Sequence, residues 1–476
     1  MVRLELFSKS ELQEIHLTSL DALKEIGVII PHDEVLRKLD ELGAEVDYKN
    51  KHVRIPHYLA EEAIRKTPHR YPVYYRDMKT RKVLGGNEIH FGTVGFATNV
   101  YDVKTRTYRR TTQQDLANAA KIADALENVE FFMTMGSPMD VPHEIVDRYM
   151  WMLSFLNTKK HIINESMHKE GVLDAIEMAS AIVGGKEELR KKPIMTVLIS
   201  ITSPFRYDPA TLEAYVEACK LGIPTFVNSG PMGGATSPAT LAGTLALNMA
   251  EFISVLTIRM AVNEKAPTII ASWARIIDML ESTAVLGGPE FAMLHAGVAQ
   301  MAHYYGIPCG GGGVLSDSKT LDNQTGYEKA LTAVIPALGG LNLICGMGLI
   351  ASENTLSLEE LVIDDEIVSY VKRIIRGIEV NEETLALDVM RRVGTTGSFI
   401  KERHTLEHFR KEMWLPKLTD RSFPDAWVKA GAHDIWVKAR EKAEKILAEH
   451  TVEPIPQEIK ERLDAVVKRA KERYVK

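Results

Sequence analysis

A run of four glycines is the first stretch of this sequence that could build a binding site. Residues 307–330 read IPCGGGGVLSDSKTLDNQTGYEKA, with Gly310, Gly311, Gly312 and Gly313 following a short apolar run. Each glycine costs about 0.5–1 kcal/mol relative to alanine in ordered structure, so the run needs a local reason. The chain there either takes backbone dihedral angles closed to other residues or lets a large group come very close.

Two kinds of ligand suit such a glycine-rich stretch. Phosphate binds where a glycine-rich loop leads into a helix N-terminus. Here Lys319 is the only cation close by, and the spacing G-x-x-x-x-G-K-[ST] is absent. The second candidate is a large and mostly flat group. Both candidates stay open at this point.

Two cysteines and one histidine are the candidates for a metal site. Cys309 and Cys345 end two predicted strands, and His295 lies on the helix before the first of these strands. The sequence contains no C-x-x-C or H-x-x-x-H spacing around them, and small buried cysteines are common. We therefore expect no metal to be bound by this chain.

The elements that position these residues alternate between short apolar runs and longer helical patterns from about residue 128 to 350. Near-continuous apolar strands separated by helices predict a parallel sheet buried on both faces. Seven such units, with EIHFGT as a possible eighth strand, favour an α/β fold of the (β/α)8 TIM-barrel type over a doubly wound sheet. The strands are expected at 128–136, 161–166, 194–202, 223–230, 266–272, 306–311 and 341–346.

The barrel does not account for the whole chain. We expect an N-terminal helical and mixed extension at 1–87, the barrel at 88–355, and a C-terminal helical extension at 356–476 packed on the barrel. Residues 8–48 carry two amphipathic helical patterns, and Ser8 with Glu11 forms a capping box. The final helices carry many Glu/Lys pairs at i,i+4, which are typical of a solvated face.

Composition limits the class of protein. The 476 residues are 45% hydrophobic and 26% charged with a net charge of −6, which is typical of a globular protein with a sizeable core. No strongly basic block is present, so a nucleic acid is not an expected partner. Three widely spaced cysteines, no signal-peptide pattern and no long uncharged apolar run favour a soluble cytoplasmic protein without a membrane span.

The loops that should follow the barrel strands carry a family resemblance. GPMGGATSPATLAG (230–243) and GGGGVLSDSKTLDNQTGYEKA (310–330) resemble stretches of the trimethylamine methyltransferase superfamily. So do IHLTSLDALKEIGV near the N-terminus and NVYDVKTRTYRRTTQQDLANAAKIADAL at 99–126, and the resemblance covers essentially the full chain. It implies a TIM barrel that moves a methyl group from an amine to the cobalt of a corrinoid (cobalamin) carried by a small partner protein.

The resemblance also limits the class of substrate that we expect. The founding trimethylamine enzymes contain pyrrolysine, whereas this sequence shows only the twenty standard residues. Characterised members without pyrrolysine act on quaternary amines such as glycine betaine, proline betaine or carnitine. We therefore expect a corrinoid-dependent methyltransferase for a quaternary amine, glycine betaine first, and a homo-oligomer. The alternatives are a non-catalytic betaine-binding paralogue and an unrelated TIM-barrel enzyme that acts on a phosphorylated metabolite.

On this reading the cobalt(I) is the nucleophile, so no catalytic residue is assigned to the chain. The site would need aromatic faces for the ammonium and a cation for a carboxylate. The candidate substrate-binding residues are Phe91, Phe96, Phe205, Tyr207, Trp273, Arg206, Arg275 and His295. Core packing is the alternative role of each aromatic residue, and a surface ion pair is that of each arginine.

The corrin ring would approach the loops at the mouth of the barrel. The residues expected to contact it are Gly233, Gly234, Gly310, Gly311, Gly312, Gly313, Asp317, Gln324 and Glu328. Gln324 and Glu328 are spaced i,i+4 and should share one helix face. Helix capping and solvation are the alternative roles of the three polar residues.

Overall fold

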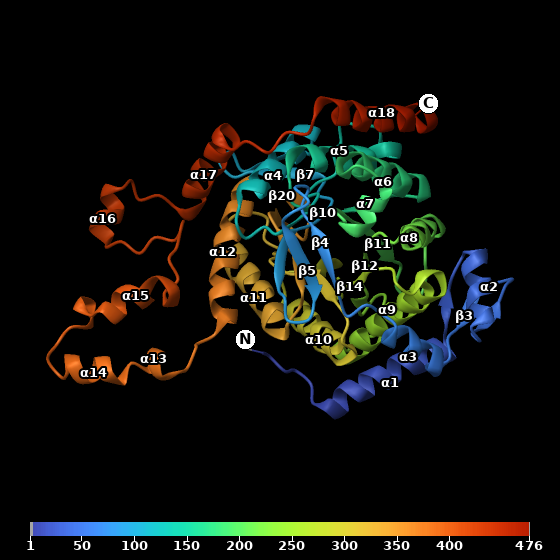
Figure 1. Cartoon of the computed structure of the whole chain (residues 1–476), viewed down its shortest axis with the longest axis horizontal. Helices are drawn as coiled ribbons and strands as arrows, with labels where there is room; N and C mark the ends of the chain where they lie inside the picture. Colours follow the sequence, from blue (N-terminus) through green and yellow to red (C-terminus); the bar gives the residue numbers. More distant parts are fainter. Residues whose placement is uncertain (1–2, 476) are drawn as a thin grey trace.

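The computed structural model describes residues 3–475, and its centre is a closed barrel of eight parallel strands (Figure 1). The strands follow one another around the barrel in chain order, and β18 pairs with β6 to close it. This confirms the predicted (β/α)8 fold, including the tentative eighth strand, which is β6. The strands are β6 (His90–Thr93), β9 (Phe131–Met133), β10 (His161–Glu165), β11 (Met195–Ile201), β12 (Thr225–Ser229), β14 (Thr268–Ser272), β17 (Cys309–Gly312) and β18 (Leu343–Met347).

Helices surround the barrel on its outside, and local sequence signals set their ends. Asp208 caps the first turn of α8 by accepting from two backbone N–H groups, and Gly222 ends that helix in the left-handed conformation. The surrounding helices are α4 (Gln113–Ala125), α5 (Val146–Asn157), α6 (Lys169–Val183), α7 (Lys186–Lys191), α8 (Pro209–Leu221), α9 (Leu241–Asn263), α10 (Pro289–Tyr305), α11 (Asn323–Gly339) and α12 (Leu358–Arg376), with a 3-10 turn η1 (His143–Ile145) before α5.

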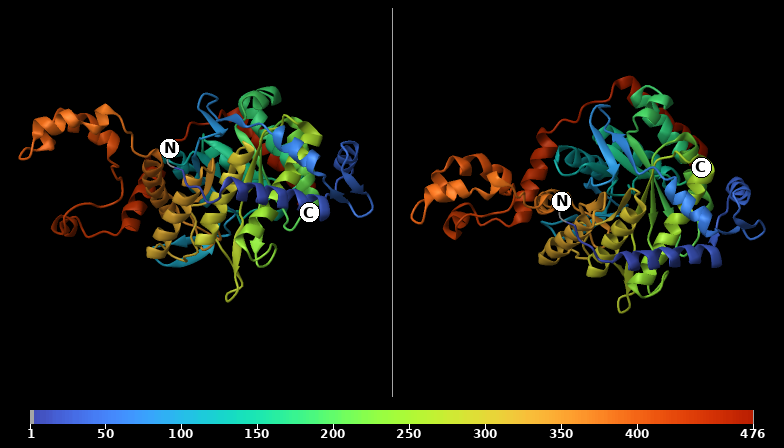
Figure 2. Two further views of the ribbon diagram at one scale, coloured as in Figure 1. Left: turned by 90° about the horizontal axis from the view of Figure 1, so that it is seen from below. Right: turned by 60° about the horizontal axis from the view of Figure 1, so that its bottom comes forward.

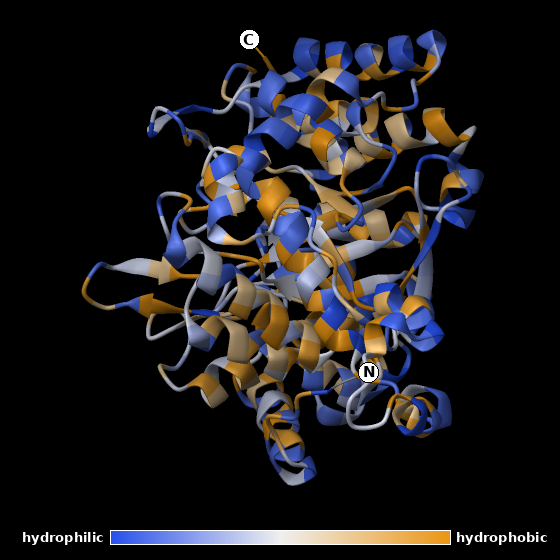
Figure 3. Ribbon diagram, turned by 90° about the vertical axis from the view of Figure 1, so that its left-hand side faces the viewer, coloured by the Kyte–Doolittle hydropathy of each residue, from blue (hydrophilic) through white to orange (hydrophobic). Residues whose placement is uncertain are grey.

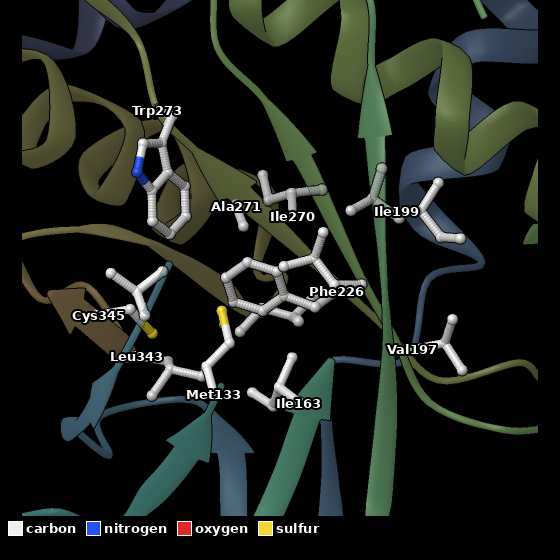
Figure 4. Close-up of a cluster of buried hydrophobic side chains, with 14 of the residues drawn as sticks. Met133, Ile163, Val197, Ile199, Phe226, Ile270, Ala271, Trp273, Leu343 and Cys345 are labelled. Atoms are coloured by element: carbon white, nitrogen blue, oxygen red, sulfur yellow. The ribbon is translucent and has the colours of Figure 1, made fainter. Parts of the chain in front are cut away.

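The inside of the barrel is filled with side chains. Figure 4 shows Phe226, Met133, Ile163 and Leu343 directed toward one another from four different strands. These four side chains are at most 1% exposed. Because this packed layer blocks the barrel interior, a ligand can bind only at one of its two ends.

The N-terminal segment covers one end and one side of the barrel. Tyr74 of the β4–β5 hairpin donates to Pro193, just before β11 begins, so the hairpin lies at the amino ends of the strands. Helices α1, α2 and α3 pack on α9, and the expected Ser8–Glu11 capping box starts α1. The elements here are α1 (Lys9–Glu25), β1 (Val28–Ile29), α2 (Asp33–Glu41), β2 (Glu45–Asp47), β3 (His52–Arg54), α3 (His57–Arg65), β4 (Arg70–Tyr74) and β5 (Arg81–Gly85).

Small sheets are added at the opposite end, after the carboxyl ends of the strands. One combines β13, β15 and β16, and the other combines β19, β20, β7 and β8. Both are built from the segments that leave the barrel strands, so they surround the mouth. Their strands are β7 (Asn99–Asp102), β8 (Thr107–Arg110), β13 (Met232–Gly233), β15 (Arg275–Asp278), β16 (Thr283–Val285), β19 (Leu349–Ile350) and β20 (Thr355–Leu356).

Helix α9 is the one helix in residues 3–475 that is long and apolar enough by composition to cross a membrane. However, 78% of its most apolar window is buried inside the protein. It packs against α1, α3 and α10, as the core helix of a globular protein does. Figure 3 shows mostly hydrophilic helical turns near the C-terminus.

The C-terminal part divides into helices on the barrel and helices away from it. Helix α12, the first helix of the expected extension, packs on α11, α4 and β18. Helices α17 and α18 also pack on the barrel helices, whereas the segment between α12 and α17 projects from the body (Figures 1 and 2). These elements are α13 (Glu382–Leu385), α14 (Leu387–Val393), η2 (Phe399–Lys401), α15 (Arg403–Glu412), α16 (Pro424–Lys429), α17 (Ile435–Glu449) and α18 (Gln457–Tyr474).

Candidate active site

A cavity of about 410 Å³ lies at the carboxyl ends of the barrel strands, where TIM-barrel enzymes place their active sites. Six of the eight barrel strands, or the segments that follow them, contribute to its wall. Aromatic, acidic, basic and amide side chains meet there. The lining residues are Val94, Gly95, Phe96, Glu165, Leu198, Ser200, Asn228, Trp273, Arg275, Ala284, Leu286, Ser352, Glu353 and Asn354.

Trp273 is the largest side chain in the wall. It follows β14 directly, is 6% exposed, and packs edge-on against Phe226 with ring centroids 6.0 Å apart. Its indole Nε1 donates to Oε1 of Glu353 at 2.7 Å. Arg275 donates from Nη1 to the backbone oxygen of Trp273 at 3.0 Å, so its guanidinium lies in the same corner of the cavity.

Glu353 lies on a short segment with unusual backbone geometry. Ala351, Ser352 and Glu353 all have positive φ angles of 52°, 54° and 67°, which cost non-glycine residues about 1 kcal/mol or more each. The segment is held by backbone hydrogen bonds from Ala351 to Ser318 and from Ser352 to Ser316. Such strain persists only where the surroundings fix it, and here it directs an acidic side chain into the cavity.

The carboxyl group of Glu353 is mainly shaped by its burial. Removal from water raises its pKa, whereas the hydrogen bond from Trp273 and the positive charge of Arg275 lower it. Burial also lowers the pKa of the Arg275 guanidinium, and Glu353 opposes that change. The two groups therefore stabilise each other's charged forms inside the cavity.

Glu165 is a second acidic residue in the wall, at the end of β10. Burial raises the pKa of its carboxyl group to about 7, and the nearby charge of Asp147 adds to the effect. Within residues 3–475 this carboxylate has no hydrogen-bond or ion-pair partner. A cation bound in the cavity would supply the missing counter-charge.

Asn228, at the end of β12, has an unsatisfied polar atom. Its side-chain oxygen is buried and has no hydrogen-bond partner among the described residues. Buried polar groups are almost always paired, so an exception in a cavity wall calls for an explanation. A bound ligand with a donor group would satisfy it.

Three of the eight predicted substrate-binding residues come together in this cavity: Phe96, Trp273 and Arg275. Phe96 also packs against Leu116 and Met150, so only part of its ring faces the cavity. The fold thus brings these three residues to one cavity, and their role in substrate binding stays a prediction.

The other five predicted residues lie elsewhere, and packing explains each. Phe91 faces outward from β6, with Nζ of Lys372 on α12 5.9 Å from its ring centre. Tyr207 is buried and its hydroxyl lies 2.7 Å from that of Ser254 on α9. Phe205 and Arg206 lie beside β1, where Arg206 is exposed.

His295 is also outside the cavity. It is fully buried on α10, with its ring nitrogens 2.7 Å from the oxygen of Phe291 and 2.6 Å from that of Ser272. Burial lowers its pKa to about 4, so the neutral ring donates to only one of these two oxygens. His295 thus fastens α10 to β14 and is not among the residues that line the cavity.

The four glycines correct our placement of a mouth loop. Gly310, Gly311 and Gly312 lie within β17, Gly313 follows at once, and all four are buried with ordinary φ angles. A Cβ atom at Gly311 would lie 2.6 Å from Cδ2 of His295, and one at Gly312 would lie 2.4 Å from Cζ of Phe291. Close approach is the reason for the run, but the approaching groups belong to this chain, so we withdraw direct corrin contact for these four residues.

Asp317, Gln324 and Glu328, which we predicted to contact the corrin ring, form hydrogen bonds next to the cavity wall. Glu328 accepts from the backbone N–H of Asp317 at 2.8 Å and from Gln324 at 2.9 Å, as the i,i+4 spacing suggested. Asp317 in turn accepts from the Ser352 hydroxyl at 2.7 Å, next to Glu353. These hydrogen bonds position the segment that carries Glu353, and contact with a corrin ring stays a prediction for the three residues.

Gly233 and Gly234 belong to the small sheet at the mouth. Gly233 is buried in β13, and Gly234 is exposed with φ +90°, which favours glycine. Both therefore lie where a partner could approach the barrel mouth. That approach stays a prediction.

The sequence reasoning missed Glu165, Asn228 and Glu353. Glu165 and Asn228 lie near the ends of the strands predicted at 161–166 and 223–230, and Glu353 lies in the stretch IASEN that follows the strand predicted at 341–346. A polar residue at the carboxyl end of a barrel strand was the available signal. Across residues 3–475, no three His, Cys, Asp or Glu side chains are grouped so as to hold a metal ion.

Comparison with known proteins gives one family. The model of the family described as trimethylamine methyltransferase (MTTB) matches residues 1–474. The chain is 36% identical to trimethylamine methyltransferase MttB of Desulfitobacterium hafniense (strain DSM 10664 / DCB-2), over 98% of this chain and 94% of that protein. It is 31% identical to glycine betaine methyltransferase of Desulfitobacterium hafniense (strain Y51), over 98% and 97% of the two chains.

Among solved structures, the chain resembles monomethylamine methyltransferase (MtmB) of Methanosarcina barkeri. That match has 10% sequence identity and a TM-score of 0.49, and it covers 92% of this chain and 94% of the other.

Proposed function

Because the chain belongs to the trimethylamine methyltransferase family and is a methyltransferase, we propose that it takes a methyl group from a quaternary amine that carries a carboxylate, such as glycine betaine, and passes it to the cobalt of a corrinoid protein. One observation carries the proposal: two aromatic rings, two carboxylates and one guanidinium surround a single cavity at the barrel mouth. Family membership also excludes our alternative of an unrelated barrel enzyme.

The cavity suits a ligand with a permanent positive charge. Trp273 and Phe96 offer aromatic surfaces, which attract quaternary ammonium groups by about 0.5–2 kcal/mol each. Glu165 and Glu353 supply negative charge in a site removed from water, where charge interactions are strong. A phosphorylated ligand would be repelled by the same two carboxylates.

Arg275 suits the other end of such a ligand. Its guanidinium borders the cavity and is partly balanced by Glu353, so an additional carboxylate can be accepted. A betaine has both charges on one small molecule. A cavity wall that contains both a guanidinium and carboxyl groups therefore favours a betaine over a simple methylamine.

The proposed methyl transfer requires no acid, base or nucleophile from the chain itself. A quaternary nitrogen leaves as a neutral tertiary amine, so no proton has to be delivered to it. Burial raises the pKa of the Cys309 thiol to about 12, and the pKa of Cys345 is raised as well, so neither supplies a thiolate. When bound, the corrinoid would supply cobalt(I) as the methyl acceptor, and the chain binds the amine, orients its methyl group and excludes water.

The mouth offers a surface for the protein that would carry the corrinoid. The turn between β15 and β16 exposes Met279 and Leu280, the latter to 93%. Arg275, Ala284 and Leu286 of the same segment line the cavity. A partner docked on this hairpin would therefore face the substrate.

The test is a screen of methylated amines with the purified chain and cob(I)alamin. We expect methylcobalamin to form with glycine betaine or a related quaternary amine, followed by its visible spectrum, and not with trimethylamine. If trimethylamine is the better substrate at equal concentration, the substrate assignment is wrong although the family stands. Binding of a betaine by calorimetry without any methyl transfer would instead identify a non-catalytic paralogue.

A further inference from the structure

Helix α9 carries two buried polar side chains at the level of the barrel mouth. Asn248 and Glu251 are about one helical turn apart, and both are at most 1% exposed. Neither is among the residues that line the substrate cavity. Because a buried carboxylate is costly unless donors surround it, the hydrogen-bond partners of Glu251 show what the helix holds in place.

Glu251 joins the carboxyl ends of β11 and β12. Its carboxylate accepts from the Ser203 hydroxyl at 2.8 Å and from the backbone N–H of Phe205 at 2.9 Å, both in the loop after β11. It also accepts from the hydroxyl of Ser229, the last residue of β12. Burial raises the pKa of the Glu251 carboxyl group, whereas these three hydrogen bonds lower it.

Asn248 joins the carboxyl ends of β12 and β14. Its side-chain nitrogen donates to the Ser229 hydroxyl at 2.8 Å and to the Ser229 backbone oxygen at 3.4 Å. Its side-chain oxygen accepts from the hydroxyl of Ser272, the last residue of β14, at 2.8 Å. The orientation of the amide follows from the Ser229 backbone oxygen, which can only accept.

These hydrogen bonds form one chain that ends at the carboxylate. Since Ser229 already accepts from Asn248, the hydrogen of its own hydroxyl goes to Glu251. At the other end, the Ser272 hydroxyl accepts from the backbone N–H of Ala274 at 3.1 Å. Bonds that point in one direction polarise one another, and here they depend on an acceptor at the end. The side chains of this chain, which we call the α9 network, are Ser272, Asn248, Ser229 and Glu251.

The α9 network lies directly behind two residues of the cavity wall. Phe226 points into the barrel (Figure 4), and side chains alternate along a strand, so Asn228 points inward and Ser229 points outward. Ser229 and Ser272 are paired across β12 and β14, and Trp273 follows at once. The backbone N–H of Trp273 donates to the oxygen of Ser229 at 2.8 Å. The network thus holds the two outward serines whose inward neighbours line the cavity.

We propose that Glu251 and Asn248 are positioning residues that fix the direction of the Trp273 side chain in the substrate cavity. They act through the two serines and do not touch the substrate. The Trp273 indole both borders the cavity and donates to Glu353, so a small rotation at the end of β14 would disturb both relationships. The inference rests on the proposed function for the nature of the ligand, whereas the network itself follows from contacts within the chain.

Glu251→Gln in the full chain tests the end of the network. The new amide oxygen has to face the N–H of Phe205, so the NH2 group faces Ser229, whose own hydrogen then has no acceptor. In protein labelled with fluorotryptophan, the fluorine signal of Trp273 is identified by its loss in Trp273→Phe. We expect Glu251→Gln to shift this signal and to weaken glycine betaine binding, measured by calorimetry, about tenfold or more.

A second substitution should rescue the first. The double variant Glu251→Gln with Ser229→Ala lacks the hydroxyl whose hydrogen lost its acceptor, so it should bind betaine more tightly than Glu251→Gln alone. A role in packing alone predicts instead that the two losses add. Asn248→Leu tests the network at another member with little change in volume, and it should also shift the Trp273 signal.

Thr257→Val is the matched control on the same helix. The buried Thr257 hydroxyl donates within α9, to the backbone oxygen of Ile253 at 2.8 Å, so its loss should leave the Trp273 signal and betaine affinity unchanged. A Trp273 signal that stays in place in the folded Glu251 and Asn248 variants, or that shifts without any loss of betaine affinity, would overturn the proposal. A wild type that binds no betaine would overturn the proposed function instead, and the fluorine signal would still decide whether the network positions Trp273.

Discussion

The indole Nε1 of Trp273 donates a hydrogen bond of 2.7 Å to Oε1 of Glu353, a residue 80 positions later in the chain. The contact joins the end of β14 to the strained segment after β19. It holds an aromatic face and a buried carboxylate in one fixed arrangement. A site that recognises a cation by both groups needs such rigidity, because flexible partners lose entropy on binding.

Trp273→Phe separates the two roles of the tryptophan. The variant keeps an aromatic surface but removes the donor to Glu353, so betaine binding should weaken by about 1–3 kcal/mol through the unpaired carboxylate. Calorimetry measures the loss. Trp273→Ala is less informative because it also removes a buried side chain from the core. Unchanged affinity in the phenylalanine variant would show that the hydrogen bond does not organise the site.

Phe96→Leu tests the second aromatic face at nearly constant volume. If the ring contributes by attraction to the ammonium, the substitution should cost about 0.5–2 kcal/mol in betaine affinity and little stability. The same titration with a neutral isostere of betaine provides the control. An equal loss for both ligands would assign Phe96 to shape and not to charge recognition.

Glu165 should make both binding and stability depend on pH. Burial raises the pKa of its carboxyl group to about 7 in the folded chain, above its ordinary value near 4.5. The unfolded chain therefore loses this proton first, and the contribution of Glu165 to stability falls between about pH 4.5 and 7. Cation binding favours the ionised form, so betaine affinity should rise as the pH passes through 7.

At high pH, Glu165→Gln should raise the stability of the fold and lower the affinity for betaine. At pH 8 the variant should melt at a higher temperature than the wild type, because a buried carboxylate has been removed, and at pH 5 the difference should be small. Betaine affinity should fall at least several-fold at pH 8 and become independent of pH near 7. If the variant binds as tightly as the wild type at pH 8, Glu165 is not part of the ammonium site.

The barrel could be predicted because its strands are buried on both faces and therefore read as continuous apolar runs. All eight expected strands are present. The site was harder to predict, since the sequence shows which residues follow a strand but not which way their side chains point. Trp273 turns into the cavity, whereas Phe91 turns out toward Lys372 and Tyr207 toward Ser254. Glu353 depends on a backbone conformation that no sequence pattern indicated.

Lys329, in the stretch 310–330 that carries the family resemblance, is another residue whose contacts could not be predicted from the sequence. Its ammonium lies 2.6 Å from Asp364 and 3.4 Å from Glu360, and all three side chains are buried. It also donates to the backbone oxygen of Val314 at 3.1 Å, where φ is +55°. Burial raises the pKa of the Glu360 carboxyl group to about 8, so the single positive charge of Lys329 pairs with Asp364. The lysine also fixes the chain that leads to Asp317.

Lys329→Met should destabilise the fold by about 3–5 kcal/mol, because it leaves the buried Asp364 carboxylate without its counter-charge. Urea unfolding measures this loss. The double variant Lys329→Met with Asp364→Asn should regain part of it, since the carboxylate that paired with the lysine is then removed as well. A loss in the double variant equal to the sum of the two single losses would contradict a charge-pairing role.

The last prediction concerns the four glycines. We expect them to be required for packing within the chain and not for the approach of a corrin ring. A methyl group at Gly311 would lie 2.6 Å from His295 and 2.7 Å from the backbone oxygen of Ser272, and neither can move easily in the core. Gly311→Ala should therefore lower the unfolding free energy by about 1–3 kcal/mol. Gly326→Ala is the matched control, because its Cβ would meet no atom within 4 Å and a helix favours alanine by about 1 kcal/mol. A Gly311→Ala variant with normal stability and slow methyl transfer would restore the view that these glycines make room for a corrin ring.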